Sequence, residues 1–354
     1  MKPLLTALLL LVFFNCIAQK NLDSLFFAKM QNRKISLPEK SSSDSIFNLP
    51  FHDVQIIDAR ADTTSIGFLK TMNVTNKLIF KNEFSEVYRN YIQEHYHLTN
   101  DSNNLLILLK TFRITRYAEI SGESDINVMD WKGGCLISAE LFLVNNSSYH
   151  ALYKVDTLLI ETSENETVSE LTAQSFRLIL KRSENKNLSE MHVGKTAFSF
   201  TDIERHINDF YEDKILKDSI LNKGVYKNFN EFKSNRPSIS NYEVHKGRLS
   251  DELFVTENSQ TYPIHDFWGY CDGHSLYIKS ADNLFQLKKA GNTFNIRGIK
   301  SLKRGLSTND QILSGITSAA IGLPITSRGI ESDNKNYTAE PTAFQLDMQT
   351  GELY

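Results

Sequence analysis

Three apolar runs in the first half of the chain restrict its fold more than any other feature. They cover Leu105–Ile114, Leu136–Val144 and Ala151–Ile160, and polar segments separate them. Runs of this length and composition are typical of strands buried in a sheet. Strands that follow one another along the chain usually become neighbours in space. The sequence therefore predicts a sheet of antiparallel strands as the centre of the first folded part.

Two amphipathic helices are predicted on either side of these strands. Their apolar positions recur at helical spacing. They are Phe84, Val87, Tyr88, Tyr91 and Ile92 in the first helix, and Val168, Leu171, Ser175, Leu178 and Ile179 in the second. A further strand is expected around Val54 and Ile56. The order strand, helix, three strands, helix predicts an α+β domain over 51–185, with its helices on one face of an antiparallel sheet.

A connector with a helix is expected over 186–224. Thr201 and Glu204 have the spacing of a capping box, in which each side chain binds a free backbone N–H of the helix start. Phe200, Ile203 and Ile207 then continue the helical pattern, which extends in polar form until Gly224. The connector separates two domains of ordinary size.

Residues 225–354 are predicted to form a mostly antiparallel β domain. Asp272-Gly273 and Gly291-Asn292 have the composition of two-residue hairpin turns. The first turn would place Cys271 opposite His274. A short apolar helix is expected near 310–324, and Phe344, Leu346 and Met348 alternate as a last strand that joins the sheet.

The N-terminus has the pattern of a secretory signal peptide over 1–18. Lys2 precedes the apolar run Leu4–Phe14, and Cys16 and Ala18 place small side chains before a cleavage site at Gln19. The alternative is a lipid anchor on Cys16. Residues 19–50 are polar and are interpreted as a flexible tether. The chain is therefore expected to be exported, and to be periplasmic or associated with the outer membrane or cell surface.

The composition restricts the kinds of partner and cofactor that the chain is expected to bind. The formal net charge is −3, which gives no strong attraction to nucleic acid. After the signal peptide no segment reaches the roughly 18 apolar residues of a membrane helix, so none is expected in the mature chain. Cys135 and Cys271 lie in different predicted domains, so we expect free thiols, with one disulfide as the alternative. No dinucleotide, phosphate-loop or hydrolase motif is present, and no cofactor is expected.

An aromatic stripe is the candidate binding site. Trp268, Tyr270 and Tyr277 fall on one face of the predicted hairpin, and such rings can stack on a sugar, a peptide or a partner surface. The competing interpretation is that the turn at 226–234, with Phe229 and Phe232, covers these rings inside the domain.

Cys271 and His274 are the alternative catalytic pair, because a thiol beside an imidazole can become a nucleophile. The register places Cys271 on the buried face, which favours a structural cysteine. His95 and His97 would diverge on a helix, so no metal site is expected there. The segment from Asp58 to Gly67 is interpreted as a strand end with Asx and Thr turns and an Arg–Asp pair.

Three stretches carry a resemblance to a known family. They are Gly224-Val-Tyr-Lys-Asn-Phe-Asn-Glu-Phe-Lys-Ser-Asn-Arg-Pro-Ser238, Trp268-Gly-Tyr-Cys-Asp-Gly273 and Phe344-Gln-Leu-Asp-Met-Gln-Thr-Gly-Glu-Leu-Tyr354. Together they resemble a family of uncharacterised exported proteins from Bacteroidota. This family has no established activity, so the resemblance transfers no functional residue. The element order of the first domain more loosely resembles periplasmic auxiliary lipoprotein domains that assist envelope machinery.

These observations lead to one expectation and one alternative. We expect an exported, non-catalytic binding or assembly protein of the bacterial cell envelope, with an envelope protein or glycan as its partner. The alternative is a thiol- or metal-dependent hydrolase that uses Cys271 and His274.

Overall fold

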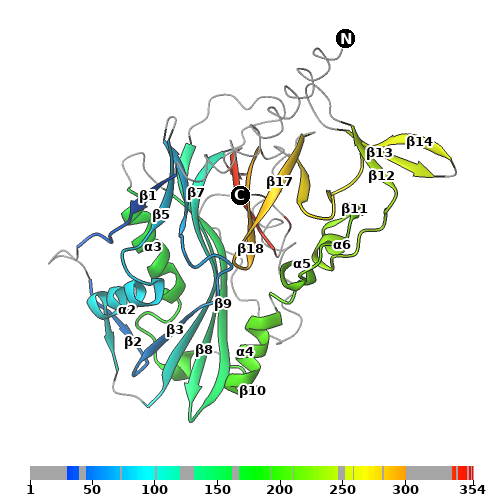
Figure 1. Ribbon diagram of the computed structural model, residues 1–354. Helices are drawn as coiled ribbons and strands as arrows, with labels where there is room; N and C mark the ends of the chain where they lie inside the picture. The colour runs from blue at the N-terminus through cyan, green and yellow to red at the C-terminus, as the bar shows by residue number, and fades with distance from the viewer. Residues whose placement is uncertain are drawn as a thin grey trace.

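The strands of the chain gather into two larger sheets that lie side by side in the computed structural model (Figure 1). The structure describes residues 30–39, 45–71, 74–99, 102–119, 131–161, 167–191, 193–209, 211–245, 252–257, 259–280, 283–299, 337–339, 342–348, 351 and 353. The predicted α+β class is confirmed. The predicted signal peptide and the helix near 310–324 lie outside the described residues.

Within the residues that the structure describes, the first sheet contains nine strands. They are β1 (Gln31–Lys34), β3 (Val54–Asp58), β4 (Gly67–Thr71), β5 (Val74–Ile79), β7 (Asn104–Glu119), β8 (Trp131–Asn145), β9 (Ser148–Ile160), β10 (Ala197–Phe198) and β19 (Tyr337–Ala339). The three long strands β7, β8 and β9 are antiparallel and include the predicted apolar runs. A separate pair joins β2 (Phe47–Leu49) to β6 (Tyr96–Leu98).

The first sheet is mixed, so the prediction of a purely antiparallel sheet was wrong. β3 and β4 run parallel to β7, and β1 runs parallel to β5. The chain travels from β3 to β7 through a long crossover that contains a helix, and such a crossover returns the chain in the same direction. Part of the predicted tether also belongs to the folded body, because β1 and β2 lie within 19–50.

Two predicted helices cover one face of this sheet. They are α2 (Phe84–His95) and α3 (Val168–Leu180). They bury an aromatic group in which the rings of Tyr88 and Phe176 are tilted by 31° with centroids 4.3 Å apart. Thr167 and Glu170 form a capping box at the start of α3. In Figure 1 these helices lie on the side of the sheet opposite the C-terminal strands.

The connector helix α4 (Phe200–Asp209) packs on the other face of the first sheet, opposite α2 and α3. Ile203 is 1% exposed and contacts a cluster that includes Leu108 and Phe142. The helix starts with Ser199 and Asp202 rather than with Thr201 and Glu204. The Asp202 N–H donates to Ser199 Oγ (3.2 Å), and the Ser199 N–H donates to Asp202 Oδ2 (2.9 Å).

Short elements complete the connector. They are the single 3₁₀ turn η1 (Leu188–Glu190), the helix α5 (Lys214–Lys217) and the helix α6 (Phe229–Lys233). The Lys289 ammonium donates to the carbonyl of Leu216, so α5 is attached to the second sheet. The connector thus contacts both sheets, because Tyr211 donates to the carbonyl of Ala59 in the first part of the chain.

The second sheet has six strands and is antiparallel throughout, as predicted. They are β11 (Gly224–Tyr226), β15 (Gly269–Cys271), β16 (Leu276–Ser280), β17 (Asn283–Ala290), β18 (Thr293–Ile299) and β20 (Thr342–Leu346). The two-residue turn at Gly291-Asn292 is confirmed, because Ala290 pairs with Thr293. The predicted register of the other hairpin was wrong, since Cys271 pairs with Leu276.

The Asp272 side chain explains this longer turn. Its Oδ1 accepts from the backbone N–H groups of His274 (2.8 Å) and Ser275 (2.7 Å). An Asx turn of this kind stabilises a four-residue loop in place of a two-residue turn. The shift is two residues, so the side chains within β15 and β16 keep their predicted faces, whereas Trp268, which precedes β15, packs with the opposite core.

A third, three-stranded sheet projects from the second one, at the upper right of Figure 1. It contains β12 (Tyr242–His245), β13 (Glu252–Glu257) and β14 (Gln260–Ile264). Its inner face packs on the second sheet through a cluster that includes Tyr242, Val255 and Tyr270. β14 is an edge strand in the described part of the chain, and its first four residues are exposed.

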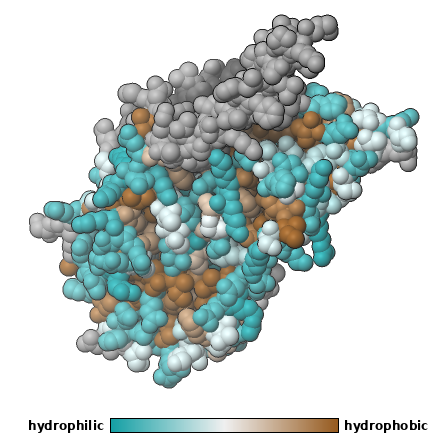
Figure 2. All heavy atoms as spheres, in the orientation of Figure 1, coloured by the Kyte–Doolittle hydropathy of each residue, from teal (hydrophilic) through white to brown (hydrophobic). Residues whose placement is uncertain are grey.

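The surface seen in Figure 2 is mostly hydrophilic, with a hydrophobic band over the lower part of the first sheet and further hydrophobic patches on the side of the second sheet. In the described residues, exposed large hydrophobic side chains are few: Ile46, Val74, Phe200, Ile220 and Tyr262. Among the helices that the structure describes, none has the length and apolar composition to cross a membrane.

Candidate functional site

The candidate site lies at a gap along one side of β7. β3 pairs with β7 up to Leu109, and β4 pairs with β7 only at Ile114. The Ala59 N–H donates to the carbonyl of Leu109 (2.8 Å), and the Ile114 N–H donates to that of Ile66 (2.7 Å). Between these two bonds β7 has an irregular register, and the loop 59–66 leaves the sheet and returns to it.

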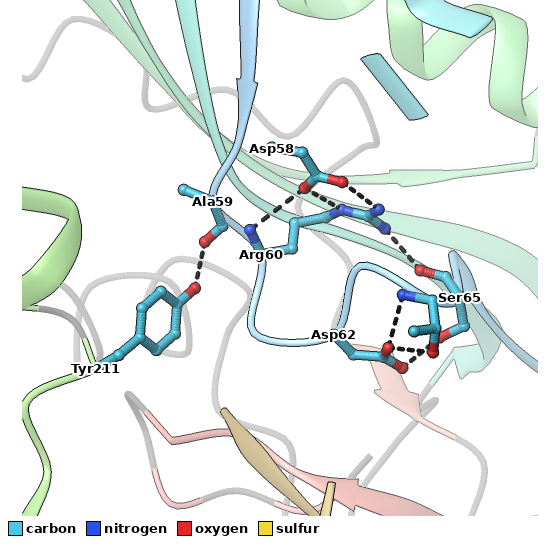
Figure 3. A network of polar contacts seen from close by, with 7 residues as sticks. Asp58, Ala59, Arg60, Asp62, Ser65 and Tyr211 are labelled. Atoms are coloured by element: carbon cyan, nitrogen blue, oxygen red, sulfur yellow. Dashed lines mark hydrogen bonds and ion pairs between the residues drawn. The ribbon is translucent and has the colours of Figure 1, made fainter. Parts of the chain in front are cut away.

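Arg60 fixes the shape of this loop (Figure 3). Its side chain is 4% exposed, and its guanidinium makes a two-pronged contact with Asp58, with Nε–Oδ1 and NH2–Oδ2 distances of 2.7 Å each. NH1 donates to the carbonyl of Ser65 (2.6 Å), and the group lies 4.5 Å from the ring centroid of Phe84. The predicted Arg–Asp pair is therefore confirmed, and it closes the loop on itself.

Asp62 links this loop to the end of the chain. Its carboxylate accepts from the Thr64 N–H (2.8 Å), the Ser65 hydroxyl (2.7 Å) and the Gln345 side chain (2.8 Å). Burial pushes the pKa of Asp62 upward, but these hydrogen bonds outweigh burial and lower the pKa. The predicted Asx turn is confirmed by the Thr64 contacts. Asp62 thereby holds β20 against the first sheet.

A small pocket of about 50 Å³ lies between the loop, β7 and β20, and this volume suits a few water molecules or a very small ligand. It is lined by Arg60, Ala61, Asp62, Ser65, Gly67, Phe68, Lys110, Thr111, Phe112, Arg113, Tyr211, Gln345, Asp347 and Met348. Three side chains of this lining are cationic and two are anionic. The pocket therefore combines charge with a restricted volume at the junction of the two sheets.

Further contacts join the two sheets around the pocket. Arg113 NH1 lies 3.7 Å from Asp347 Oδ2, and the rings of Phe68 and Phe344 stack with centroids 5.2 Å apart. β19 adds to β7 at Tyr117–Glu119, although the strands on either side of it, β18 and β20, belong to the second sheet. The chain thus passes from the second sheet to the first and back, which interlocks the two.

Lys110, at the edge of the pocket, also belongs to a buried polar cluster. It contacts Glu140 of β8, and its Nζ lies 2.9 Å from His206 Nε2 of α4. The same His206 atom lies 2.9 Å from Glu140 Oε2. Burial lowers the pKa of Lys110 to about 8, although the Glu140 carboxylate acts to raise it. Burial raises the pKa of Glu140, but the contacts with His206 and Lys110 outweigh it and lower that pKa.

The sequence analysis missed this cluster, although a signal was present. Lys110 ends the apolar run of β7, and Glu140 interrupts that of β8, both on the face occupied by Leu108 and Phe142. A charge inside a strand buried on both faces needs a partner on the covering element. Here that element is α4, which supplies His206.

The structure separates the predicted aromatic stripe into two parts, in which Tyr270 is buried and Trp268 and Tyr277 are half-buried. Trp268 packs on Phe229 and Phe232, with centroids 5.2 and 4.3 Å away. Tyr270 is 3% exposed and stacks on Tyr277 with centroids 4.5 Å apart, beneath the projecting sheet. Trp268 is in contact with the turn at 226–234, as the competing interpretation had it, whereas Tyr270 and Tyr277 pack against the projecting sheet and not against that turn.

Cys271 and His274 are not brought together as a reactive pair in any contact of the described chain. Cys271 is 0% exposed, its sulfur accepts from the Gly273 N–H (3.3 Å), and burial raises its pKa. His274 is exposed, and its backbone binds Asp272. Cys135 and Cys271 are both free thiols in separate cores, so the alternative of a disulfide was wrong.

The described residues contain no group of three or more His, Cys, Asp or Glu side chains placed to hold a metal ion. α2 ends at His95, and His97 lies on β6, so the two histidines fall on different elements. The His95 ring lies against Tyr91, tilted by 34° with centroids 4.4 Å apart.

A first prediction concerns Asp62 and acid. Because the folded pKa is lowered, the carboxylate contributes stability above its unfolded pKa, near 3.8, and loses it as pH falls through the folded pKa. Asp62→Asn should cost about 2 kcal/mol at neutral pH through weakened hydrogen bonds. Its urea midpoint should also fall less than the wild-type midpoint between about pH 5 and pH 2.

Gln345→Ala is the matched control, because it removes one donor and leaves the carboxylate in place. It should shift the acid transition in the same direction by a smaller amount. If the urea midpoints of the wild type and of Asp62→Asn fell equally between about pH 5 and pH 2, the role assigned to Asp62 would be contradicted.

Comparison with known proteins assigns neither a family nor an activity to this chain. No family model matches the chain, and no curated protein matches it. Among solved structures, the crystal structure of protein XCC0632 from Xanthomonas campestris, described there under DUF330, is similar at a TM-score of 0.26 and 9% identity. The similarity covers 43% of this chain and 91% of that one. It is distant and assigns no activity to this chain.

Proposed function

We propose that this chain is an exported, non-catalytic binding or assembly protein of the bacterial cell envelope, with an envelope protein or glycan as its partner. Export is supported by the pattern of Lys2, the apolar run Leu4–Phe14 and Ala18. The resemblance of the C-terminal motifs to exported Bacteroidota proteins supports the same location.

The interlocked junction of the two sheets is the observation that supports a binding role best. Interfaces between domains usually permit relative motion unless they are extensive. Here β19 crosses to the first sheet, and Gln345 and Asp347 of the same segment bind Asp62 and Arg113. A rigid body of this kind holds several surfaces in fixed relation, as a protein that positions partners requires.

The alternative of a hydrolase that uses Cys271 and His274 gains no support from this geometry. The thiol is fully buried, and its raised pKa disfavours the thiolate that a nucleophile needs. The proposal therefore keeps the binding role.

Affinity capture tests this proposal. The mature chain is immobilised on a column, incubated with a detergent extract of the envelope, and cross-linked to whatever it binds. We expect one envelope protein or glycan to be enriched over a column that carries heat-unfolded chain. His245 and Tyr262 on the projecting sheet are exposed, so the double variant His245→Ala/Tyr262→Ala changes the surface without opening a core. Ile220→Ala, at an exposed connector position, is the matched control.

Two results would count against the proposal. One is equal recovery of every component on folded and unfolded chain. The other is a chain found in the cytoplasm with residues 1–18 intact. Intact mass of the exported chain also distinguishes cleavage before Gln19 from a lipid on Cys16.

A further inference from the structure

Lys110 lies where the junction pocket meets the buried cluster. It lines the pocket together with Ser65, Thr111 and Tyr211, while its Nζ contacts Glu140 and lies 2.9 Å from His206 Nε2. Its side chain is only 3% exposed. An amine in such a position has little access to bulk water, and the same residue borders the pocket.

The heavy atoms around Lys110 suit two proton arrangements. In one, Lys110 is an ammonium group that donates to Glu140 and to an unprotonated His206 Nε2. In the other, His206 carries hydrogen on Nε2 and donates to Glu140 Oε2, and Lys110 is a neutral amine. His206 Nε2 lies 2.9 Å from both partners, so a proton can pass between Lys110 and His206 without movement of either side chain.

The charged groups that face Lys110 come from three elements. Burial lowers the pKa of Lys110 to about 8, and the ammonium of Lys154 on β9 acts in the same direction. Glu140 on β8 and Asp156 on β9 act to raise it. His206 on α4 completes the surroundings. A substantial fraction of the amine is therefore neutral at slightly alkaline pH, as a nucleophilic lysine requires.

We propose that Lys110 binds a small α-oxo acid covalently, as a reversible Schiff base, in the pocket between the loop 59–66 and β20. The carbonyl group is assigned because an amine with a neighbouring proton acceptor reacts with carbonyl carbon. The carboxylate is assigned because Arg60 and Arg113 line the same pocket. The volume of about 50 Å³ restricts the ligand to the smallest members of the class, such as glyoxylate or pyruvate.

The proposed step is balanced without an added oxidant or reductant. The nitrogen lone pair of Lys110 attacks the carbonyl carbon and forms a C–N bond, while the carbonyl π electrons move to oxygen. His206 takes a proton from nitrogen and passes it to that oxygen, which gives a hydroxyl group. The second proton on nitrogen then passes to the hydroxyl by the same route, the nitrogen lone pair forms the C=N bond, and the C–O bond breaks to release water. The products are one imine and one water, and hydrolysis reverses the reaction. This inference extends beyond the proposed function and does not depend on it.

Reductive trapping of the full mature chain tests the inference. The chain is incubated with glyoxylate and sodium cyanoborohydride near pH 8, and tryptic peptides are analysed by mass spectrometry for carboxymethyl-lysine. We expect Lys110 to be modified at least about tenfold faster than the average lysine, because a pKa near 8 leaves far more neutral amine than the usual value near 10.4. Lys288 on β17, half-buried in the second sheet, provides a reference in the same sample.

Variants and a second probe separate the parts of the inference. His206→Gln should slow modification of Lys110 several-fold and leave Lys288 unchanged. Acetaldehyde, which has the carbonyl but no carboxylate, should modify Lys110 more slowly than glyoxylate. Equal rates for the two probes would overturn the assignment of an oxo acid. Modification of wild-type Lys110 no faster than that of Lys288 would overturn the site altogether, and that measurement requires no variant to fold.

Discussion

Gly67→Ala is expected to destabilise the protein by about 3–5 kcal/mol, a large share of the stability of an ordinary domain. Gly67 has φ = +141°, which side chains rarely adopt, and it sits where the loop 59–66 re-enters the sheet. A Cβ there would overlap the carbonyl oxygen of Ile114 and lie 2.7 Å from its carbonyl carbon and its nitrogen. Strained dihedrals and overpacking each cost about 1–3 kcal/mol.

The surrounding structure cannot relieve this overlap easily. Ile114 donates its N–H to Ile66 (2.7 Å) and pairs with Cys135 on the other side, so its backbone is held from both directions. Gly291→Ala is the matched control. Its φ is +60°, and a Cβ would meet only the Ala61 carbonyl at 3.7 Å, so the cost should be about 1–2 kcal/mol. Similar urea midpoints for the two variants, measured by circular dichroism, would contradict the assigned role of Gly67.

Glu140→Gln is expected to cost about 3–5 kcal/mol at pH 7, because it leaves the buried Lys110 ammonium without its counter-charge. Glu140 is 0% exposed and contacts both Lys110 and His206, so no water can take its place. Lys110 can escape part of this penalty by losing its proton. Its folded pKa then lies further below the unfolded value, near 10.5, and a lowered lysine pKa makes the folded state gain stability as pH rises.

The stability that Glu140→Gln loses relative to the wild type should therefore become smaller between about pH 6 and pH 9. Urea unfolding at each pH measures this difference. The double variant Lys110→Met/Glu140→Leu is the control, because replacing both charges by apolar groups is often neutral or stabilising. It should recover most of the lost stability. A double variant as unstable as the single one would mean that shape, and not charge, determines the effect.

Local patterns predicted a good part of the fold. The helices α2 and α3 follow from apolar spacing, and the turn at Gly291-Asn292 follows from its composition. The loop around Arg60 was also interpreted correctly, since its Asx turn and its ion pair involve neighbours in sequence. Each of these features depends on residues within a few positions of one another, so the local pattern of residues is enough to predict it.

The remaining features depend on contacts that no local pattern records. β4 and β5 are short and mix polar with apolar residues, so they gave no strand signal, and the parallel pairing of β3 with β7 requires the crossover. The bond from Gln345 to Asp62 joins residues 283 positions apart. The start of α4 was misplaced because Ser199-x-x-Asp202 competes with Thr201-x-x-Glu204, and the structure decides between them.

The candidate site could be predicted only in part. Arg60 and Asp62 were recognised as a turn with an ion pair, but nothing in the sequence joined them to β20 or to Lys110. The aromatic residues were identified as a group, yet Trp268 and Tyr270 face different cores, because β15 begins at Gly269. Which ring is covered depends on the projecting sheet and on α6, and both are placed by tertiary packing.

The crossing of β19 bears on how the chain must be synthesised. Tyr337 pairs with Glu119, more than two hundred residues earlier. The C-terminal end of β7 therefore gains this neighbour only after residues 337–339 have been synthesised. Long-range pairing of this kind slows folding and leaves strand edges open meanwhile. The two halves are consequently poor candidates for separate expression, and a chain that passes a narrow export pore unfolded would gain its final topology only on the far side.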